Sequence, residues 1–145
     1  MRIFLDTSVL VAAVVAGHES HTRALAVLAS VQNGKCEGYI SAHTLAEMYA
    51  ILTKLPPPSR HAPEQALLTI EENVIKYFKI SSLTGADYAA LLREAAVSGI
   101  QGGTIYDAVL LKSAVKVDVA KIFTLNLKHF QAVAPKNIHS EILAP

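Results

Sequence analysis

Short apolar runs alternate with amphipathic segments along almost the whole chain, and this alternation restricts the fold more than any other feature. Short apolar runs between turn residues predict buried strands, and apolar residues recurring every three or four positions predict helices. We therefore expect an α/β fold, a three-layer α/β/α sandwich with a mainly parallel central sheet. The predicted strands are Ile3–Leu5, Gly38–Ile40, Val74–Ile80 and Ala120–Thr124, with a small edge strand at Ile138–Ile142.

Helix start and stop residues separate these strands. Three consecutive prolines from Pro56 end one helix, Thr84 is placed to cap the start of another, and Gly99 is placed to close it. No repeat or linker interrupts the pattern, so we expect a single domain over residues 1–145. The predicted helices are Val9–Ala16, His21–Val31, Ser41–Leu55, Pro63–Asn73, Gly85–Ser98 and Ile105–Lys116, with a short helical turn at Asn126–Phe130.

Composition excludes several classes of protein. Hydrophobic residues make up 52% and charged residues 17% of the chain, which excludes intrinsic disorder and leaves apolar surface for a partner, so we expect a homodimer. The longest apolar run, Val9–Ala16, is far shorter than the roughly 18 residues of a membrane span, so we expect a cytoplasmic protein with no membrane contact. Cys36 is the only cysteine, which excludes an internal disulfide and a zinc finger. The net charge of +1 argues against coating nucleic acid by bulk charge.

One aspartate stands where sheets of this kind place their ligands. Asp6 directly follows the first predicted strand, at the carboxyl end of that strand. The alternative is that Asp6 only caps the helix that follows it.

Two further acidic residues lie near the starts of predicted helices, and their local pattern fits either helix capping or a functional site. Glu47 follows Thr44 by three residues and Asp107 follows Thr104 by three, which is the pattern of a capping box. Asp87 has the same spacing, and we assign it to capping alone. Glu47 and Asp107 differ from it because they lie among apolar neighbours.

A parallel sheet is expected to bring Asp6, Glu47 and Asp107 to one cleft. Two carboxylates about 4 Å apart repel by about 4 kcal/mol at an effective dielectric constant of about 20, a large part of the roughly 5–15 kcal/mol that stabilises a domain. Such a cluster needs a cation, and oxygen ligands without cysteine select Mg²⁺ or Mn²⁺. These ions favour phosphodiester chemistry, in which they activate a water and neutralise charge on the phosphate.

Four motifs in this order resemble the PIN-domain ribonucleases, and within them the VapC-type toxins of toxin–antitoxin pairs. The motifs are Ile-Phe-Leu-Asp6-Thr7-Ser8, Ser41-Ala-His-Thr-Leu-Ala-Glu47, Ile105-Tyr-Asp107-Ala and Thr124-Leu-Asn126-Leu-Lys-His-Phe130. The resemblance covers essentially the whole chain. It implies that Asp6, Glu47 and Asp107 are the catalytic metal ligands, that Thr7 or Ser8 supports them, that the substrate is RNA, and that a small antitoxin protein is a partner.

Asn126 is a departure from the family pattern. Many members carry a fourth acid there, so a fully occupied second metal site is in question. Asn126 can still offer a neutral oxygen to the metal or to its water, or it can simply cap the helical turn that follows. An alternative function is therefore a catalytically weak PIN scaffold that binds RNA or protein without cleavage.

Overall fold

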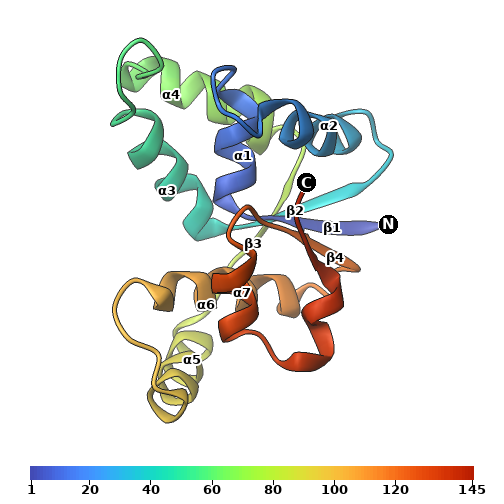
Figure 1. The fold of residues 1–145 in the computed structure, drawn as a ribbon, viewed down its shortest axis with the longest axis vertical. Helices are drawn as coiled ribbons and strands as arrows, with labels where there is room; N and C mark the ends of the chain where they lie inside the picture. Colours follow the sequence, from blue (N-terminus) through green and yellow to red (C-terminus); the bar gives the residue numbers. More distant parts are fainter.

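The computed structural model describes residues 1–145 and places a parallel five-stranded sheet between two layers of helices (Figure 1). The strand order is β3-β2-β1-β4-β5, and every neighbouring pair is parallel. The predicted α/β sandwich is confirmed. The strands are β1 (Arg2–Leu5), β2 (Glu37–Ser41), β3 (Lys79–Ser81), β4 (Lys121–Phe123) and β5 (Ile142–Leu143).

The helices divide between the two faces of the sheet. In Figure 1, α1 to α4 cover one face, and α5 to α7 cover the other. A π-helical turn, Glu71–Ile75, extends α4, and a 3-10 helix, Lys136–Glu141, precedes β5. The bounds are α1 (Thr7–Val14), α2 (His21–Gln32), α3 (Ala42–Leu52), α4 (Pro63–Ile70), α5 (Gly85–Ser98), α6 (Thr104–Lys116) and α7 (Leu127–Val133).

The sheet separates two hydrophobic cores, and β1 contributes to both. Ile3 and Leu5 point into the core beneath α1 to α4, whereas Phe4 points into the core beneath α5 to α7. All three side chains are almost completely buried. Because successive side chains of a strand alternate between faces, an uninterrupted apolar run is what a strand covered on both sides requires.

The third predicted strand was wrong in its extent. Val74–Ile80 was expected to be extended, but Val74 and Ile75 belong to the π-helical turn and only Lys79–Ser81 forms a strand. Val74 and Phe78 are four residues apart and both enter the same core, so the run satisfies a helical spacing as well as an extended one. Periodicity alone does not separate the two in a run this short. The C-terminal strand is also shorter than expected, because residues 138–141 belong to the 3-10 helix.

The order of the sheet fixes where a site can form. The chain runs outward from β1 through β2 to β3, then returns to β4 on the other side of β1. Parallel sheets of this type bind ligands outside the carboxyl ends of the two strands where the order reverses. Here those strands are β1 and β4, in register with Leu5 opposite Phe123.

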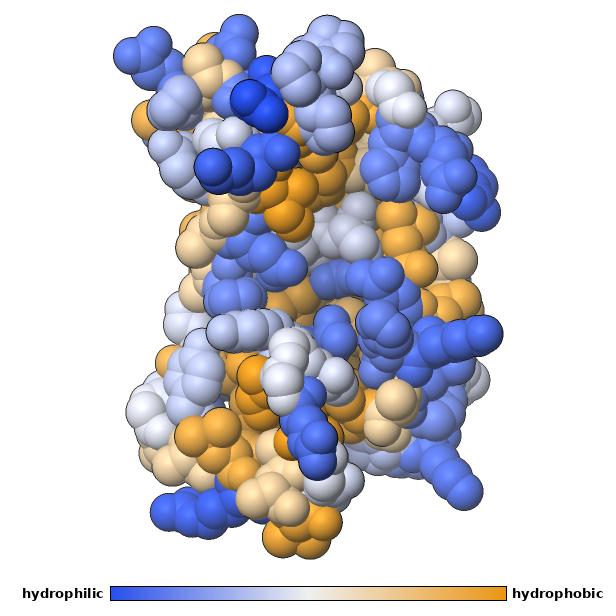
Figure 2. Space-filling model, turned by 60° about the vertical axis from the view of Figure 1, so that its left-hand side comes forward, coloured by the Kyte–Doolittle hydropathy of each residue, from blue (hydrophilic) through white to orange (hydrophobic).

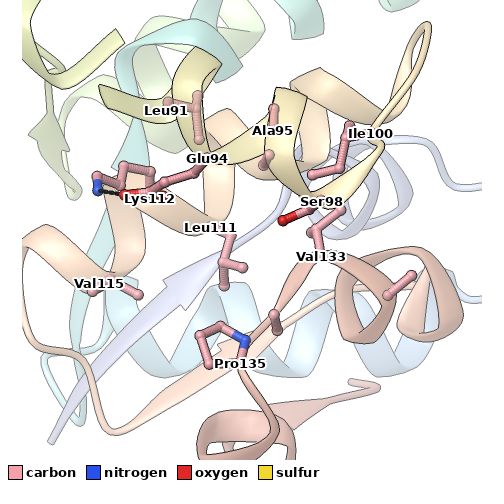
Figure 3. A pocket seen from close by; sticks show the side chains of 13 residues that line it. Leu91, Glu94, Ala95, Ser98, Ile100, Leu111, Lys112, Val115, Val133 and Pro135 are labelled. Atoms are coloured by element: carbon pink, nitrogen blue, oxygen red, sulfur yellow. Dashed lines mark ion pairs between the residues drawn. The ribbon is translucent and has the colours of Figure 1, made fainter. Parts of the chain in front are cut away.

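Away from this edge, α5, α6 and α7 leave an apolar cavity of about 510 Å³ between them (Figure 3). Leu91, Leu111 and Val133 line it from the three helices, and an ion pair joins Lys112 to Glu94 at 3.5 Å. No helix of the chain combines the length and apolar character needed to span a lipid bilayer.

Candidate active site

Asp6 begins the site directly after β1. Asp6 is the N-cap residue of α1 and its carboxylate is buried, but the helix shows no side-chain capping hydrogen bond. Instead, the Ser8 hydroxyl donates to Asp6 Oδ2 at 2.6 Å, and the Thr124 hydroxyl donates to the same oxygen at 2.8 Å. Burial raises the pKa of the Asp6 carboxyl above its ordinary value, although these two hydrogen bonds lower it.

The Asp6 carboxylate links the carboxyl ends of β1 and β4, because it follows β1 and accepts a hydrogen bond from the residue that follows β4. Thr124 directly follows β4, and its hydroxyl also accepts the backbone N–H of Asn126 at 3.0 Å. The backbone N–H of Leu125 donates to the Ser8 hydroxyl at 3.0 Å, and that of Asp6 donates to the Phe123 carbonyl at 2.9 Å. The loop after β4 is therefore hydrogen-bonded to the first residues after β1.

Glu47 reaches the site from the second turn of α3. Ser41, not Thr44, occupies the cap of α3, because its hydroxyl accepts the backbone N–H of His43. Thr44 is buried inside the helix, and its hydroxyl is hydrogen-bonded to the Thr7 hydroxyl at 3.1 Å. The Thr7 hydroxyl is also 3.0 Å from Glu47 Oε2, so Thr7, the residue after Asp6, holds the Glu47 side chain at the start of α1.

Asp107 enters from the first turn of α6. The expected cap by Thr104 was wrong, since the helix starts at Thr104 and Gly103 precedes it without a side-chain capping bond. Burial raises the pKa of the Asp107 carboxyl above its ordinary value. The negative charges of Asp6 and Glu47 raise it further, while His129 acts in the opposite direction. The charges of both Asp6 and Glu47 therefore act on the Asp107 carboxyl.

The negative charges of Asp6 and Glu47 affect Asp107, but the three carboxylates are not close enough together to bind one metal ion in this structure. No three Asp, Glu, His or Cys side chains stand together at the separation that holds a metal ion. The donors nevertheless fit a hard divalent cation, because they are carboxylates and hydroxyls with no cysteine among them. A cation held by Asp6, Glu47 and Asp107 would offset the repulsion that raises the pKa of Asp107.

Asn126 lies at the margin of this cluster. It precedes α7 in the cap position, yet its side chain makes no capping bond. Together with Ser8 and Arg23 it lines a cavity of about 520 Å³. Asp118 lies in the turn before β4, at the opposite edge of the sheet, with a backbone φ of 50°.

Thr124 and His43 are two residues near these acids that the sequence analysis did not select. Sequence position alone indicates where each lies, but not which side chains it contacts. Thr124 follows β4 as Asp6 follows β1, so the carboxyl-edge rule applies to both. His43 stands four residues before Glu47, which places the two on one face of α3, with His43 Nε2 3.6 Å from Glu47 Oε2. Figure 2, which brings forward the left-hand side of Figure 1, shows a hydrophilic band across the middle of this edge with apolar surface above and below.

Comparison with known proteins places this arrangement in context. A family model described as PIN domain matches residues 3–135. Ribonuclease VapC40 of Mycobacterium tuberculosis is 31% identical over 138 residues, an alignment covering 95% of this chain and 96% of the relative.

Two solved structures share the fold at low sequence identity. The crystal structure of M. tuberculosis VapC20, described as a Sarcin-Ricin loop cleaving toxin, superposes with a TM-score of 0.70 and 18% identity over 90% of this chain and 94% of that one. VapBC2 from Rickettsia felis, bound to a DNA fragment from its promoter, gives a TM-score of 0.60 and 21% identity over 88% and 90% of the two chains.

Proposed function

This chain belongs to the PIN-domain family and is an endoribonuclease of the VapC type, and from that premise we propose that Asp6, Glu47 and Asp107 form its metal site. The observation that carries the proposal is the hydrogen bond of 3.0 Å from the Thr7 hydroxyl to Glu47 Oε2, which brings Glu47 to the residue that follows Asp6. The negative charges of Asp6 and Glu47, which raise the pKa of Asp107, support the same grouping. The three acids come from three separate segments, the residue after β1 and the first two turns of α3 and α6. No structural requirement of the fold explains why like charges gather there.

We propose that the ion is Mg²⁺ or Mn²⁺. When bound, such an ion activates a water and neutralises charge on the scissile phosphate. The residues of this chain supply the rest: Asp6, Glu47 and Asp107 hold the ion, and Thr7 keeps the Glu47 side chain at the site. Ser8 and Thr124 fix the orientation of the Asp6 carboxylate. Asn126 offers a neutral oxygen to the ion or to its water in place of a fourth acid.

The proposed substrate is RNA, which is cleaved at a phosphodiester bond. Purified protein incubated with total RNA and Mg²⁺ or Mn²⁺ is expected to produce discrete fragments, and EDTA is expected to abolish them. Asp6→Asn is the matched variant, since asparagine keeps a carbonyl oxygen for the hydroxyls of Ser8 and Thr124. Fragments that persist undiminished in EDTA, or with this variant, would refute the metal site.

The proposed protein partners are a small antitoxin and a second copy of the chain. VapC-type enzymes are the toxins of toxin–antitoxin pairs, and the VapBC2 structure is one such assembly by its name. Co-expression with the product of the adjacent gene is expected to yield a stable complex in which RNA cleavage is inhibited. An uninhibited nuclease with no complex would contradict the antitoxin proposal.

A further inference from the structure

Two aromatic rings lie flat against each other beside the acidic cluster. His43 of α3 and Tyr106 of α6 stack with their centroids 5.3 Å apart and their planes only 3° from parallel. This is the offset-stacked arrangement that aromatic pairs favour. We call these two residues the aromatic pair.

The aromatic pair is attached to the same helix turns as two of the proposed metal ligands. His43 Nε2 lies 3.6 Å from Glu47 Oε2, and Tyr106 directly precedes Asp107. α3 and α6 also contact each other, so the position of the rings is fixed relative to the acids. A planar group bound on this pair would therefore lie beside the reacting phosphate.

Tyr106 does little for the fold. It remains 55% exposed and belongs to neither hydrophobic core. Tyr39, by contrast, donates its hydroxyl to Glu37 and packs against the second core. The stacking contact orients the Tyr106 ring, but the ring remains exposed beside the proposed active site. These properties are typical of a binding surface and not of a core residue.

We propose that the aromatic pair is a stacking platform for a nucleobase next to the scissile phosphate. This inference rests on the proposed function, because it takes RNA as the ligand. Unpaired bases of RNA stack on Tyr and His side chains, and such contacts tolerate different bases because each base has a π face. The platform binds the nucleotide through its base, whereas the metal site binds it through its phosphate.

Steady-state kinetics with an aromatic series test the platform. Initial rates are measured on a random-sequence RNA pool for wild type, Tyr106→Phe and Tyr106→Leu. Loss of one base stack is worth roughly a 5- to 150-fold change in affinity, so Tyr106→Leu is expected to raise KM by about that factor with kcat nearly unchanged. Tyr106→Phe keeps the ring and is expected to behave as wild type. Tyr88→Leu removes another exposed tyrosine, from α5, and is the control.

Three outcomes would overturn the proposal. An unchanged KM for Tyr106→Leu would show that the ring does not touch RNA. An equal effect in Tyr106→Phe would assign the contact to the hydroxyl and not to the ring. A fall in kcat together with a lowered Tm in Tyr106→Leu would assign Tyr106 a structural role.

A binding experiment separates failure of the platform from failure of the proposed function. The chain has no tryptophan, so Tyr106→Trp in the Asp6→Asn background introduces a single indole reporter. The RNA pool is expected to quench its emission, and a ribose-phosphate oligomer of equal length without bases is not. Equal quenching by both would overturn the platform. If wild type cleaves no RNA, the metal-site proposal fails, while quenching by the base-bearing pool alone still supports stacking.

Discussion

Asp87 and Asp107 each follow a threonine by three residues, but only Asp87 forms the capping box. The backbone N–H of Asp87 donates to the Thr84 hydroxyl, and the backbone N–H of Thr84 donates to the Asp87 carboxylate. Lys116 also pairs with Asp87 at 2.8 Å, and this bond holds the pKa of Asp87 at about 2. Asp107 has no such partner and faces two other acids. The same local pattern therefore forms a capping box at Asp87 but not at Asp107, where nearby negative charges raise the pKa of the carboxyl.

Substitution of Asp107 by asparagine separates the two roles. We expect Asp107→Asn to lower kcat/KM by more than about 100-fold, because even partners of metal ligands are worth 10- to 100-fold. Without metal its Tm should equal or exceed that of wild type, since a repelling charge is removed. Its stabilisation by excess Mn²⁺ should shrink, because only an ion bound to the folded state raises stability. Melting curves in EDTA and in Mn²⁺, beside cleavage rates, measure all three quantities.

Thr84→Ala is the control for that variant. It breaks a real capping box and is expected to cost about 1 kcal/mol of stability while leaving cleavage unchanged. The assignment of Asp107 fails if Asp107→Asn behaves as Thr84→Ala does.

Because the pKa values of Asp6 and Asp107 are raised in the folded chain, they determine whether stability rises or falls with pH. Above the ordinary carboxyl value of 3.8, the unfolded chain has lost these protons while the folded chain still binds them. Metal-free stability should therefore fall as pH rises through the interval between the unfolded and folded pKa values. Glu37 and Asp87, with pKa values lowered to about 2, act oppositely, and their stabilising contribution is complete above pH about 4.5.

Thermal melts in EDTA from pH 4.5 upward test this sign, using the ordinary value for Glu as the lower limit. Asp6→Asn and Asp107→Asn are each expected to flatten the decline seen in wild type. A wild-type Tm that rises with pH over this range, and equally in both variants, would show that the two carboxyls do not carry the dependence.

At the scale of single elements, β2 depends on a glycine for close packing. A Cβ built on Gly38 would lie 2.6 Å from Phe78 Cε1 and 2.6 Å from Val31 Cγ1. Both neighbours belong to the core beneath α1 to α4. Phe78 and α2 therefore approach the strand more closely than any side chain on residue 38 permits.

Gly38→Ala is accordingly expected to cost about 1–3 kcal/mol, which lowers Tm by roughly 2–12 °C for a domain of this size. Gly85→Ala is the matched control, because a Cβ there meets nothing within 4 Å and residue 85 starts α5. We expect that control to leave Tm unchanged or to raise it slightly. Equal Tm values for the two variants would mean that Phe78 and Val31 yield without cost.

At the scale of the whole molecule, large apolar side chains remain exposed at both ends of the long axis. Leu67 and Leu68 of α4 are 51% and 59% exposed, and Leu92 and Val97 of α5 are 57% and 90% exposed. α4 and α5 lie at opposite ends of the molecule in Figure 1. Two helical layers on one thin sheet do not hide all the apolar residues that make up 52% of the chain.

We therefore expect a homodimer at tens of micromolar, detected by sedimentation equilibrium without antitoxin. Charge substitutions distinguish the two surfaces: Leu68→Glu tests α4, and Leu92→Glu tests α5. One of them is expected to shift the protein to a monomer with its Tm retained. A monomeric wild type at this concentration would refute the prediction.

The sequence by itself determined the class of fold and the candidate acids. Alternating apolar runs and amphipathic segments suffice for a parallel sheet between helices, because both periodicities are local. Asp6 was identified by its place after the first strand, a position that needs no tertiary information. The limits of Val74–Ile80 and the cap of α6 were wrong, because an apolar run or a threonine fits more than one local structure.

Only the tertiary structure decided which side chains contact one another around the proposed site. Thr44, Thr84 and Thr104 precede their acids by the same spacing, and nothing local tells the capping box from the cluster. The return of the chain to β4 beside β1 brings Thr124 onto the Asp6 carboxylate, 118 residues away in sequence. The packing of α3 near α6 likewise joins His43 to Tyr106. Electrostatic and stacking interactions act between groups that are close in space. They therefore depend on how the strands and helices are arranged, which cannot be deduced from the spacing of residues in the sequence.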